Sequence, residues 1–142
     1  MKKVYLFSDG SSLGNPGPGG WCALLRYKEH EKIFKGNEPH TTNNRMELKA
    51  VIEGLRALKE PCEVELYSDS NYVVQGIEEW LPKWKRKNFK GVKNPDLWQE
   101  YLRISAPHRI KAHWVAGHSG HKENELCDKI AREMATLAKG DG

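Results

Sequence analysis

Two short stretches of the sequence end an apolar run with the same pair of residues, a serine followed by an aspartate. They are Ser8-Asp9 and Ser68-Asp69. An aspartate in such a position commonly forms a turn, because its side chain hydrogen-bonds to nearby backbone. Two carboxylates that converge in one crevice, however, repel each other unless a cation or a proton lies between them. If the two apolar runs are neighbouring strands, the pair predicts a functional site with a cation or a proton between the two carboxylates.

Two further acids could complete such a site, and each has an ordinary structural explanation. Glu47 lies three residues after Asn44, which is the spacing of a capping box at the start of a helix. Asp128 lies in the first turns of a predicted helix, where negative charge complements the helix dipole. Either residue taken singly is explained by its helix. Only together with Asp9 and Asp69 do they indicate a catalytic site.

A glycine-flanked segment with two histidines, His118 and His121, precedes Asp128. With Cys127 these histidines supply only three ligands, at a spacing unlike that of familiar structural zinc sites, so zinc is disfavoured. A loop histidine is most often simply solvated. An imidazole with an ordinary pKa of about 6.5 can nevertheless take up and release a proton near neutrality. His118 is therefore a candidate for proton transfer.

A sheet and its connecting helices must bring these residues together. The sequence predicts strands over residues 4–8, 21–28, 32–35, 64–68 and 110–115. The first three are joined by short turns and form an antiparallel meander. A helix with apolar residues at 48, 51, 52, 55 and 58 leads to the fourth strand, which can then lie parallel to the first. Carboxyl ends of neighbouring strands would hold Asp9 and Asp69 about 4.8 Å apart.

Further helices are predicted along the second half of the chain. They cover residues 71–78 and 80–88, with a break marked by Gly76 and Pro82, a segment from Asn94-Pro95 to about residue 107, and a last helix around residues 127–138. We therefore expect one α/β domain over residues 1–142, a mixed sheet with helices packed on it, in which residues 139–142 form a loose tail.

Composition narrows the class of protein. A chain of 142 residues with 38% hydrophobic content can bury one sizeable core. No apolar stretch approaches the length of a membrane span, and the first apolar run is too short for a signal peptide. Three cysteines without C-x-x-C spacing indicate a reduced protein. We expect a cytoplasmic monomer that does not associate with membranes.

Positive charge is concentrated in residues 81–95, which we call the basic segment. It contains no acidic residue and six basic ones: Lys83, Lys85, Arg86, Lys87, Lys90 and Lys93. Such a run favours a polyanionic partner. Trp80 and Trp84 lie at helical spacing beside these cations. They either pack one helix face onto the core or contact the sugars of a nucleic acid.

Five motifs in order closely resemble bacterial ribonuclease H of type 1. They are Ser-Asp-Gly-Ser at 8–11, Asn-Pro-Gly-Pro-Gly-Gly at 15–20, Thr-Thr-Asn-Asn-Arg-Met-Glu at 41–47, Ser-Asp-Ser at 68–70 and Gly-His-Ser-Gly-His-Lys-Glu-Asn-Glu-Leu-Cys-Asp at 117–128. The resemblance extends from residue 5 to about residue 138. It implies a five-stranded mixed sheet of order 3-2-1-4-5 with its first three strands antiparallel and helices on its flanks.

The resemblance also implies an activity and its residues. The family cleaves the RNA strand of RNA/DNA hybrids, and we expect 5'-phosphate and 3'-hydroxyl products. The family's catalytic and metal-binding acids fall on Asp9, Glu47, Asp69 and Asp128, and its loop histidine falls on His118. Carboxylates suit two Mg²⁺ ions, with Mn²⁺ as a substitute, and a two-metal mechanism.

Substrate-binding residues follow from the same resemblance. Contacts in the minor groove fall on Asn15, Asn43, Asn44 and Gln75, with Thr42 near a DNA phosphate. Contacts to the DNA strand of the hybrid fall on Trp80, Trp84, Lys85, Arg86 and Lys87. Asn and Gln suit recognition of 2'-hydroxyls, because each side chain both donates and accepts hydrogen bonds. Turn and cap chemistry is the alternative for Asn15 and Asn43.

Three other functions remain to be weighed. A non-catalytic hybrid-binding module would share the fold and the basic segment but has no use for four convergent acids. A phosphoacceptor receiver domain also gathers aspartates at strand ends, yet this chain lacks paired acids after its first strand. A nuclease of the same fold that acts on DNA junctions is disfavoured by the asparagine-rich groove contacts.

Overall fold

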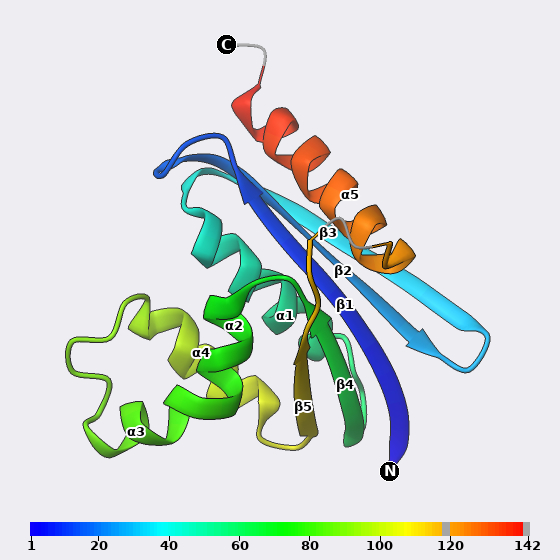
Figure 1. Ribbon diagram of the computed structural model, residues 1–142, viewed down its shortest axis with the longest axis vertical. Helices are drawn as coiled ribbons and strands as arrows, with labels where there is room; N and C mark the ends of the chain where they lie inside the picture. The colour runs from blue at the N-terminus through cyan, green and yellow to red at the C-terminus, as the bar shows by residue number, and fades with distance from the viewer. Residues whose placement is uncertain (118–119, 141–142) are drawn as a thin grey trace.

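The computed structural model describes residues 1–117 and 120–140 (Figure 1). Its centre is a five-stranded sheet in the order β3-β2-β1-β4-β5. The strands are β1 (Lys2–Ser12), β2 (Gly17–Tyr27), β3 (His30–Thr41), β4 (Cys62–Ser68) and β5 (Arg109–Trp114). Strands β1, β2 and β3 pair antiparallel, whereas β4 is parallel to both β1 and β5. The expected mixed sheet and its strand order are confirmed.

The helices lie on both faces of this sheet. They are α1 (Asn43–Arg56), α2 (Asn71–Gln75), the π-helical turn η1 (Gly76–Trp80), α3 (Leu81–Arg86), α4 (Pro95–Ser105) and α5 (Lys122–Lys139). Figure 1 shows α5 alone across one face, over the antiparallel strands, and the other helices on the opposite side. No helix in the described ranges is long and apolar enough to cross a membrane.

Alternation along β1 supplies a core to each face. Leu6 points to the α1 side and belongs to the larger core, whereas Phe7 points to the α5 side and packs with Cys22 and Cys127. Successive side chains of a strand point to opposite faces, so one strand serves both cores. By the same period Asp9 lies on the α5 side and Gly10 on the α1 side. β1 therefore carries both the carboxylate and the surface against which α1 packs.

The break expected at Gly76 and Pro82 coincides with changes of helix type, since the chain is α-helical over Asn71–Gln75, π-helical over Gly76–Trp80 and α-helical again over Leu81–Arg86. Gly76 also serves packing, because a Cβ there would collide with the indole ring of Trp98, which is fully buried. Pro82 falls in the first turn of α3, where a missing backbone N–H costs little. A short π-helical turn of this kind occurs mostly inside or between α-helical segments.

Candidate active site

Asp9 and Asp69 meet where β1 continues beyond the end of its parallel neighbour. The pairing of β1 with β4 extends to Phe7 opposite Tyr67, after which β4 ends at Ser68 and β1 runs on to Ser12. Asp9 thus lies within a strand and not at its end as expected, while Asp69 directly follows β4. The edge of β1 is open at this point, so a third group can approach it.

That third group is Glu47, carried by α1. Ligand oxygens of Asp9, Glu47 and Asp69 all lie within 4.8 Å of one another, and we call these three residues the acidic cluster. Gly10 allows this close approach, because a Cβ at Gly10 would collide with the backbone of Met46 and Glu47. The backbone N–H of Gly10 donates to Glu47 Oε1 at 2.8 Å and to Asp9 Oδ1 at 2.9 Å. One amide therefore orients both carboxylates.

The capping-box explanation of Glu47 is wrong. Helix α1 begins earlier than the sequence pattern indicated, and its N-cap is Thr42, whose Oγ1 accepts a hydrogen bond from the Arg45 N–H at 3.3 Å. Glu47 consequently falls in the second turn of the helix, where its side chain turns toward β1 and leaves the helix terminus. Glu47 is 6% exposed, and α1 is capped without it.

Burial and mutual repulsion dominate the electrostatics of the acidic cluster. Burial raises the pKa of Asp9 from 3.8 to about 7, and the charges of Asp69 and Asp128 add to that increase. Burial also raises the pKa of Glu47 well above its ordinary value, with the neighbouring charge of Asp9 as the next cause. Without a cation, the cluster therefore retains protons near neutrality. A divalent cation would replace those protons and relieve the repulsion.

Asp128 lies beside the acidic cluster but outside its tight group of ligands. It projects from α5 and, with Asp69 and Gly117, lines a hollow of about 20 Å³. Its Oδ2 accepts from the Arg132 guanidinium at 2.8 Å, one helical turn away. Helix α5 comes this close to the sheet because Gly20 on β2 has no side chain to push it away. His118 lies outside the described residues.

Asn124 is a site residue that the sequence reasoning missed. Its Nδ2 donates to the carbonyl of Tyr67 at 3.0 Å, which joins α5 to the end of β4 just before Asp69. Its Oδ1 is buried, has no hydrogen-bond partner in the described ranges, and belongs to a residue lining the same hollow as Asp128. The i, i+4 spacing of Asn124 and Asp128 was the available signal, because it puts both on one helix face.

The asparagines of the first loop and of α1 form one surface. Asn15 Oδ1 accepts from the backbone N–H of Asn43 at 2.8 Å and from Ser12 Oγ at 2.9 Å. Asn15 thus fixes the β1–β2 loop against the start of α1, which is the structural role that the sequence left open. Asn44 is exposed at the same helix start, next to the N-cap Thr42. Gln75 ends α2 and is half-buried.

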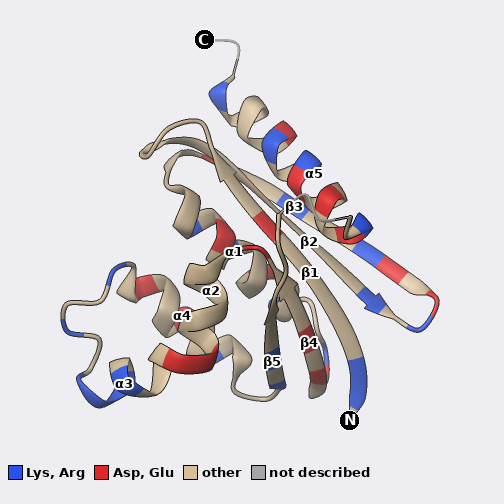
Figure 2. Ribbon diagram, viewed as in Figure 1, with Lys and Arg blue, Asp and Glu red and all other residues tan. Residues whose placement is uncertain are grey.

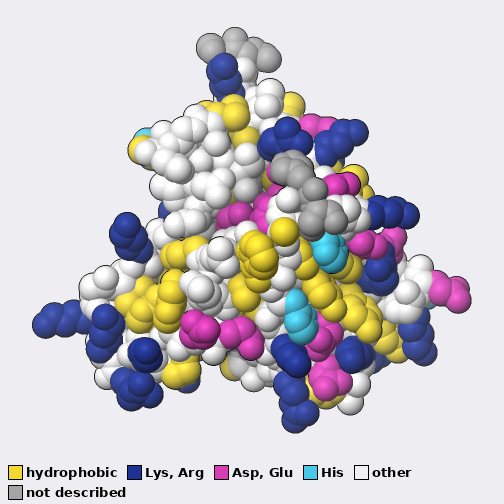
Figure 3. Space-filling model, in the orientation of Figure 1, with side chains coloured by type: hydrophobic (Ala, Val, Ile, Leu, Met, Phe, Trp, Pro, Cys, Tyr) yellow, Lys and Arg dark blue, Asp and Glu magenta, His cyan; other side chains and the backbone are white. Residues whose placement is uncertain are grey.

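The basic segment lies apart from these groups. Its six cationic side chains are all exposed, and Figure 2 shows Lys and Arg gathered on α3 and the loop after it, away from the acids on β1 and α1. Figure 3 shows basic side chains projecting from this edge while acidic ones lie near the centre of the face. Trp84 packs on Trp98 with ring centroids 5.1 Å apart, and Trp80 packs on Trp84 at 5.8 Å. Packing therefore accounts for much of the surface of Trp84.

A mixed sheet of this order, with carboxylates converging beside its central strand, defines the class of nucleases built on the ribonuclease H-like fold. Comparisons agree with this class. The family model described as RNase H matches residues 1–136. Ribonuclease H of Campylobacter concisus is 61% identical over 141 residues, which cover 99% of this chain and 98% of that protein. The chain belongs to the RNase H family of nucleases.

Solved structures agree on the fold. The crystal structure of LC9-RNase H1 superposes with a TM-score of 0.89 at 32% identity, covering 97% of this chain and 74% of that one. LC11-RNase H1, crystallised in complex with an RNA/DNA hybrid, gives a TM-score of 0.67 at 22% identity, with 95% and 98% covered. The second likeness bears on the fold alone.

Proposed function

We propose that this chain is an endonuclease that hydrolyses the RNA strand of RNA/DNA hybrids by two-metal-ion catalysis and leaves 5'-phosphate and 3'-hydroxyl ends. One observation carries the proposal. In a chain of the RNase H family, the carboxylates of Asp9, Glu47 and Asp69 converge within 4.8 Å beside an open strand edge. Two buried acids and a half-buried one have no structural reason to converge unless cations neutralise them.

The donor set favours Mg²⁺, with Mn²⁺ as a substitute. The acidic cluster offers only carboxylate oxygens, which are the hard ligands that these ions prefer over the nitrogen and sulfur ligands typical of zinc. The buried Oδ1 of Asn124, a residue that lines the hollow beside Asp69 and Asp128, would offer one further oxygen acceptor there. When bound, the two ions would supply a nucleophilic water and stabilise the departing ribose oxygen.

The protein's own residues would divide the remaining work. Asp9 would help to hold both ions, because its carboxylate lies against that of Glu47 and the charges of Asp69 and Asp128 both act on it. Asp128, whose Oδ2 accepts from the Arg132 guanidinium, would also help to hold the ions. His118, assigned from sequence, would assist proton movement or product departure. Its replacement by alanine should slow turnover without abolishing it, and complete loss of metal-dependent activity would contradict that role.

Substrate recognition would come from the two surfaces on either side of the acids. Asn15, Asn43, Asn44 and Gln75 would read 2'-hydroxyls in the minor groove, and Thr42 would lie near a DNA phosphate. The cations of the basic segment, chiefly Lys85, Arg86 and Lys87, would hold the phosphates of the DNA strand, with Trp80 and Trp84 beside its sugars. Asn15 can serve both its structural contact and the substrate. We further propose that the chain acts as a cytoplasmic monomer.

The test is cleavage of end-labelled RNA/DNA, RNA/RNA and DNA/DNA duplexes, with Mg²⁺ or with a chelator, by this chain and by its Asp9→Asn variant. We expect cutting of the RNA in the hybrid alone, dependent on both the metal and Asp9. Hybrid binding without cutting by the unaltered chain would favour a binding module. Cutting of DNA/DNA would favour a junction nuclease.

A further inference from the structure

Helices α1 and α4 are joined by two ion pairs, one at each end of their contact. Near the acidic cluster, Arg45 Nη2 lies 2.8 Å from Asp96 Oδ2. At the far end, Arg56 Nη2 lies 2.7 Å from Glu100 Oε1. The two pairs join the same helices with the same chemistry. They differ in what else they contact.

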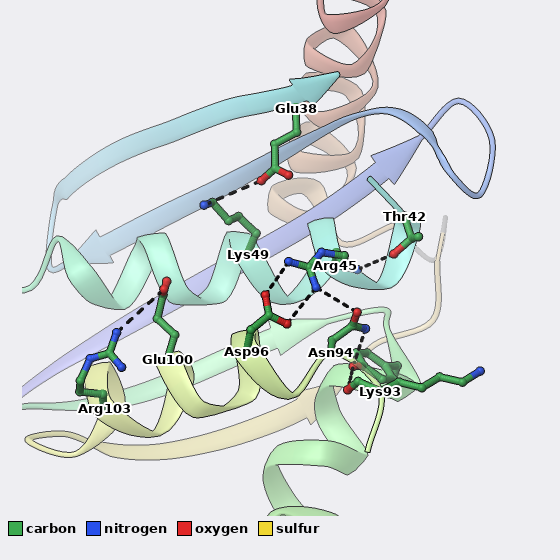
Figure 4. A network of polar contacts seen from close by, with 10 residues as sticks. Glu38, Thr42, Arg45, Lys49, Lys93, Asn94, Asp96, Glu100 and Arg103 are labelled. Atoms are coloured by element: carbon green, nitrogen blue, oxygen red, sulfur yellow. Dashed lines mark hydrogen bonds and ion pairs between the residues drawn. The ribbon is translucent and has the colours of Figure 1, made fainter. Parts of the chain in front are cut away.

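The Arg45 pair continues into the basic segment (Figure 4). Arg45 Nη1 donates to Asp96 Oδ1 and to Asn94 Oδ1, each at 3.1 Å. Asn94 Nδ2 in turn donates to the hydroxyl of Tyr72 at 3.0 Å. That hydroxyl also accepts from Trp98 Nε1 at 2.8 Å and donates to the carbonyl of Lys93 at 3.4 Å. The far pair instead contacts Glu53 and Arg103 on its own two helices.

The network joins three parts of the proposed site. Arg45 lies two residues before Glu47, and Tyr72 lies three residues after Asp69. Asn94, near the end of the basic segment, adopts the left-handed conformation with φ 56° and ψ 47°. Asparagine tolerates that conformation, and its side chain is held at both its oxygen and its nitrogen. The end of the basic segment is thereby fixed to α1, which carries Glu47, and to α2, which begins two residues after Asp69.

Stability is a poor explanation for this network. The side chains of Arg45 and Asp96 are 30% and 63% exposed, and ion pairs so exposed contribute little to the free energy of unfolding. The two-point contact between guanidinium and carboxylate does, however, fix a distance and an orientation. The contribution of the Arg45–Asp96 pair is therefore to fix how α1 and α4 lie relative to each other.

We propose that Arg45 and Asp96 are positioning residues that hold the basic segment at a fixed offset from the acidic cluster, so that one hybrid duplex engages both surfaces at once. The inference rests on the proposed function. Two rigidly linked contacts on one ligand bind more tightly than the same contacts loosely tethered, because the second forms without a further loss of freedom. Loosening the link should therefore weaken hybrid binding while the acids themselves stay in place.

Electrostatics and positioning make opposite predictions for Asp96→Ala, which makes it the sharpest variant. Removing a negative charge from a surface that binds a polyanion should by itself strengthen binding. If Asp96 acts through the position of the basic segment, binding should weaken instead. Glu100→Ala is the matched control, because it removes the same charge from the same helix at the far ion pair.

The experiment measures hybrid affinity in an Asp9→Asn background, together with thermal unfolding. We expect Asp96→Ala to raise the Kd by about fivefold and Glu100→Ala to leave it unchanged or lower, with similar melting temperatures for the two. In the catalytically intact chain, Asp96→Ala should raise KM about as much and leave kcat within about twofold. An unchanged or lower Kd for Asp96→Ala would overturn the inference. Failure of the Asp9→Asn parent to bind hybrid would instead overturn the proposed function beneath it.

Discussion

Asp9 and Glu47 are 4% and 6% exposed, whereas the six cations of the basic segment all lie at the surface. Both regions concentrate charge of one sign, but they do so under different physical conditions. In the acidic cluster, low water access makes each charge felt strongly by its neighbours, and the pKa of Asp9 is raised accordingly. Around the basic segment, water and salt screen each charge from the next.

This difference separates two tasks. Metal-assisted chemistry needs oxygens fixed to within fractions of an ångström, and close packing of β1 against α1 at Gly10 provides this. Attraction of a duplex needs only enough positive charge in the right direction. We therefore expect substitutions in the acidic cluster to act sharply on turnover and on unfolding, and substitutions in the basic segment to act gradually on affinity.

The largest effect is expected from Asp9→Asn. The substitution should lower kcat with Mg²⁺ by at least about 1000-fold, because it removes a carboxylate that we propose helps to hold both ions. Metal-free stability should stay the same or rise, since one repelling charge is lost from a buried group. Single-turnover cleavage and thermal unfolding in chelator test the two halves. A large fall in melting temperature would contradict the view that repulsion strains this cluster.

The pH dependence of metal-free stability should come next in size. The pKa of Asp9 is about 7 in the folded chain and about 3.9 in an unfolded one, so the folded state binds more protons between these values. Its contribution is therefore present at low pH and is lost as the pH rises through about 7, on the order of 2–4 kcal/mol.

Thermal unfolding in chelator at pH 5 and pH 8 measures this loss. The difference between the unaltered chain and Asp9→Asn should grow in favour of the variant as the pH rises, and Mg²⁺ should remove much of the difference at pH 8. A parallel pH dependence of the two proteins would show that Asp9 does not titrate in this range.

Gly10→Ala should disturb the geometry of the acidic cluster without removing an acid. The added methyl group must push the start of α1 away from β1, because it would meet backbone and not a flexible side chain. We expect a loss of about 2 kcal/mol in stability and a fall in kcat larger than that of the control Ser11→Ala. Ser11 is the next residue of β1 and is half-buried. Metal titration by calorimetry should show weaker binding for Gly10→Ala alone.

The sequence sufficed for the sheet because its signals are local. Apolar runs and short turns located the strands of the meander, and the motifs grouped Glu47 with Asp9 and Asp69, which the structure brings together. The sequence alone did not show contacts between residues that lie far apart along the chain. The strand containing Asp9 continues to Ser12 because β2 pairs with it that far. The residues of β1 alone do not show how far the neighbouring strand extends.

Packing likewise overrode two local rules. Gly76 and Pro82 are helix breakers by propensity, yet the first is required by contact with Trp98 and the second sits where a helix tolerates proline. Asn124 escaped notice because its hydrogen bond to Tyr67 joins residues far apart in the sequence. The Arg45 network escaped for the same reason. Its members become neighbours only when α1, α2 and α4 pack together.

The smallest effect per residue is expected in the basic segment, where charge acts through solvent. The double variant Lys85→Gln/Lys87→Gln should weaken hybrid binding by about 3–10-fold near 50 mM salt. The logarithm of its association constant should also fall less steeply with the logarithm of the salt concentration, by up to about 2 in the slope. Melting temperature and kcat should hardly change, because both side chains are exposed.

Lys59→Gln/Lys111→Gln is the matched control for that variant, since it removes the same charge from exposed lysines outside the basic segment. If both double variants weaken binding equally, net charge alone attracts the duplex and the location of the cations is irrelevant. If only the first does, while the Asp9→Asn parent keeps the full salt slope, then affinity and chemistry reside in separate regions of the chain. Substitutions in the acidic cluster would then alter metal binding and turnover without altering affinity for the duplex, and substitutions in the basic segment would do the reverse.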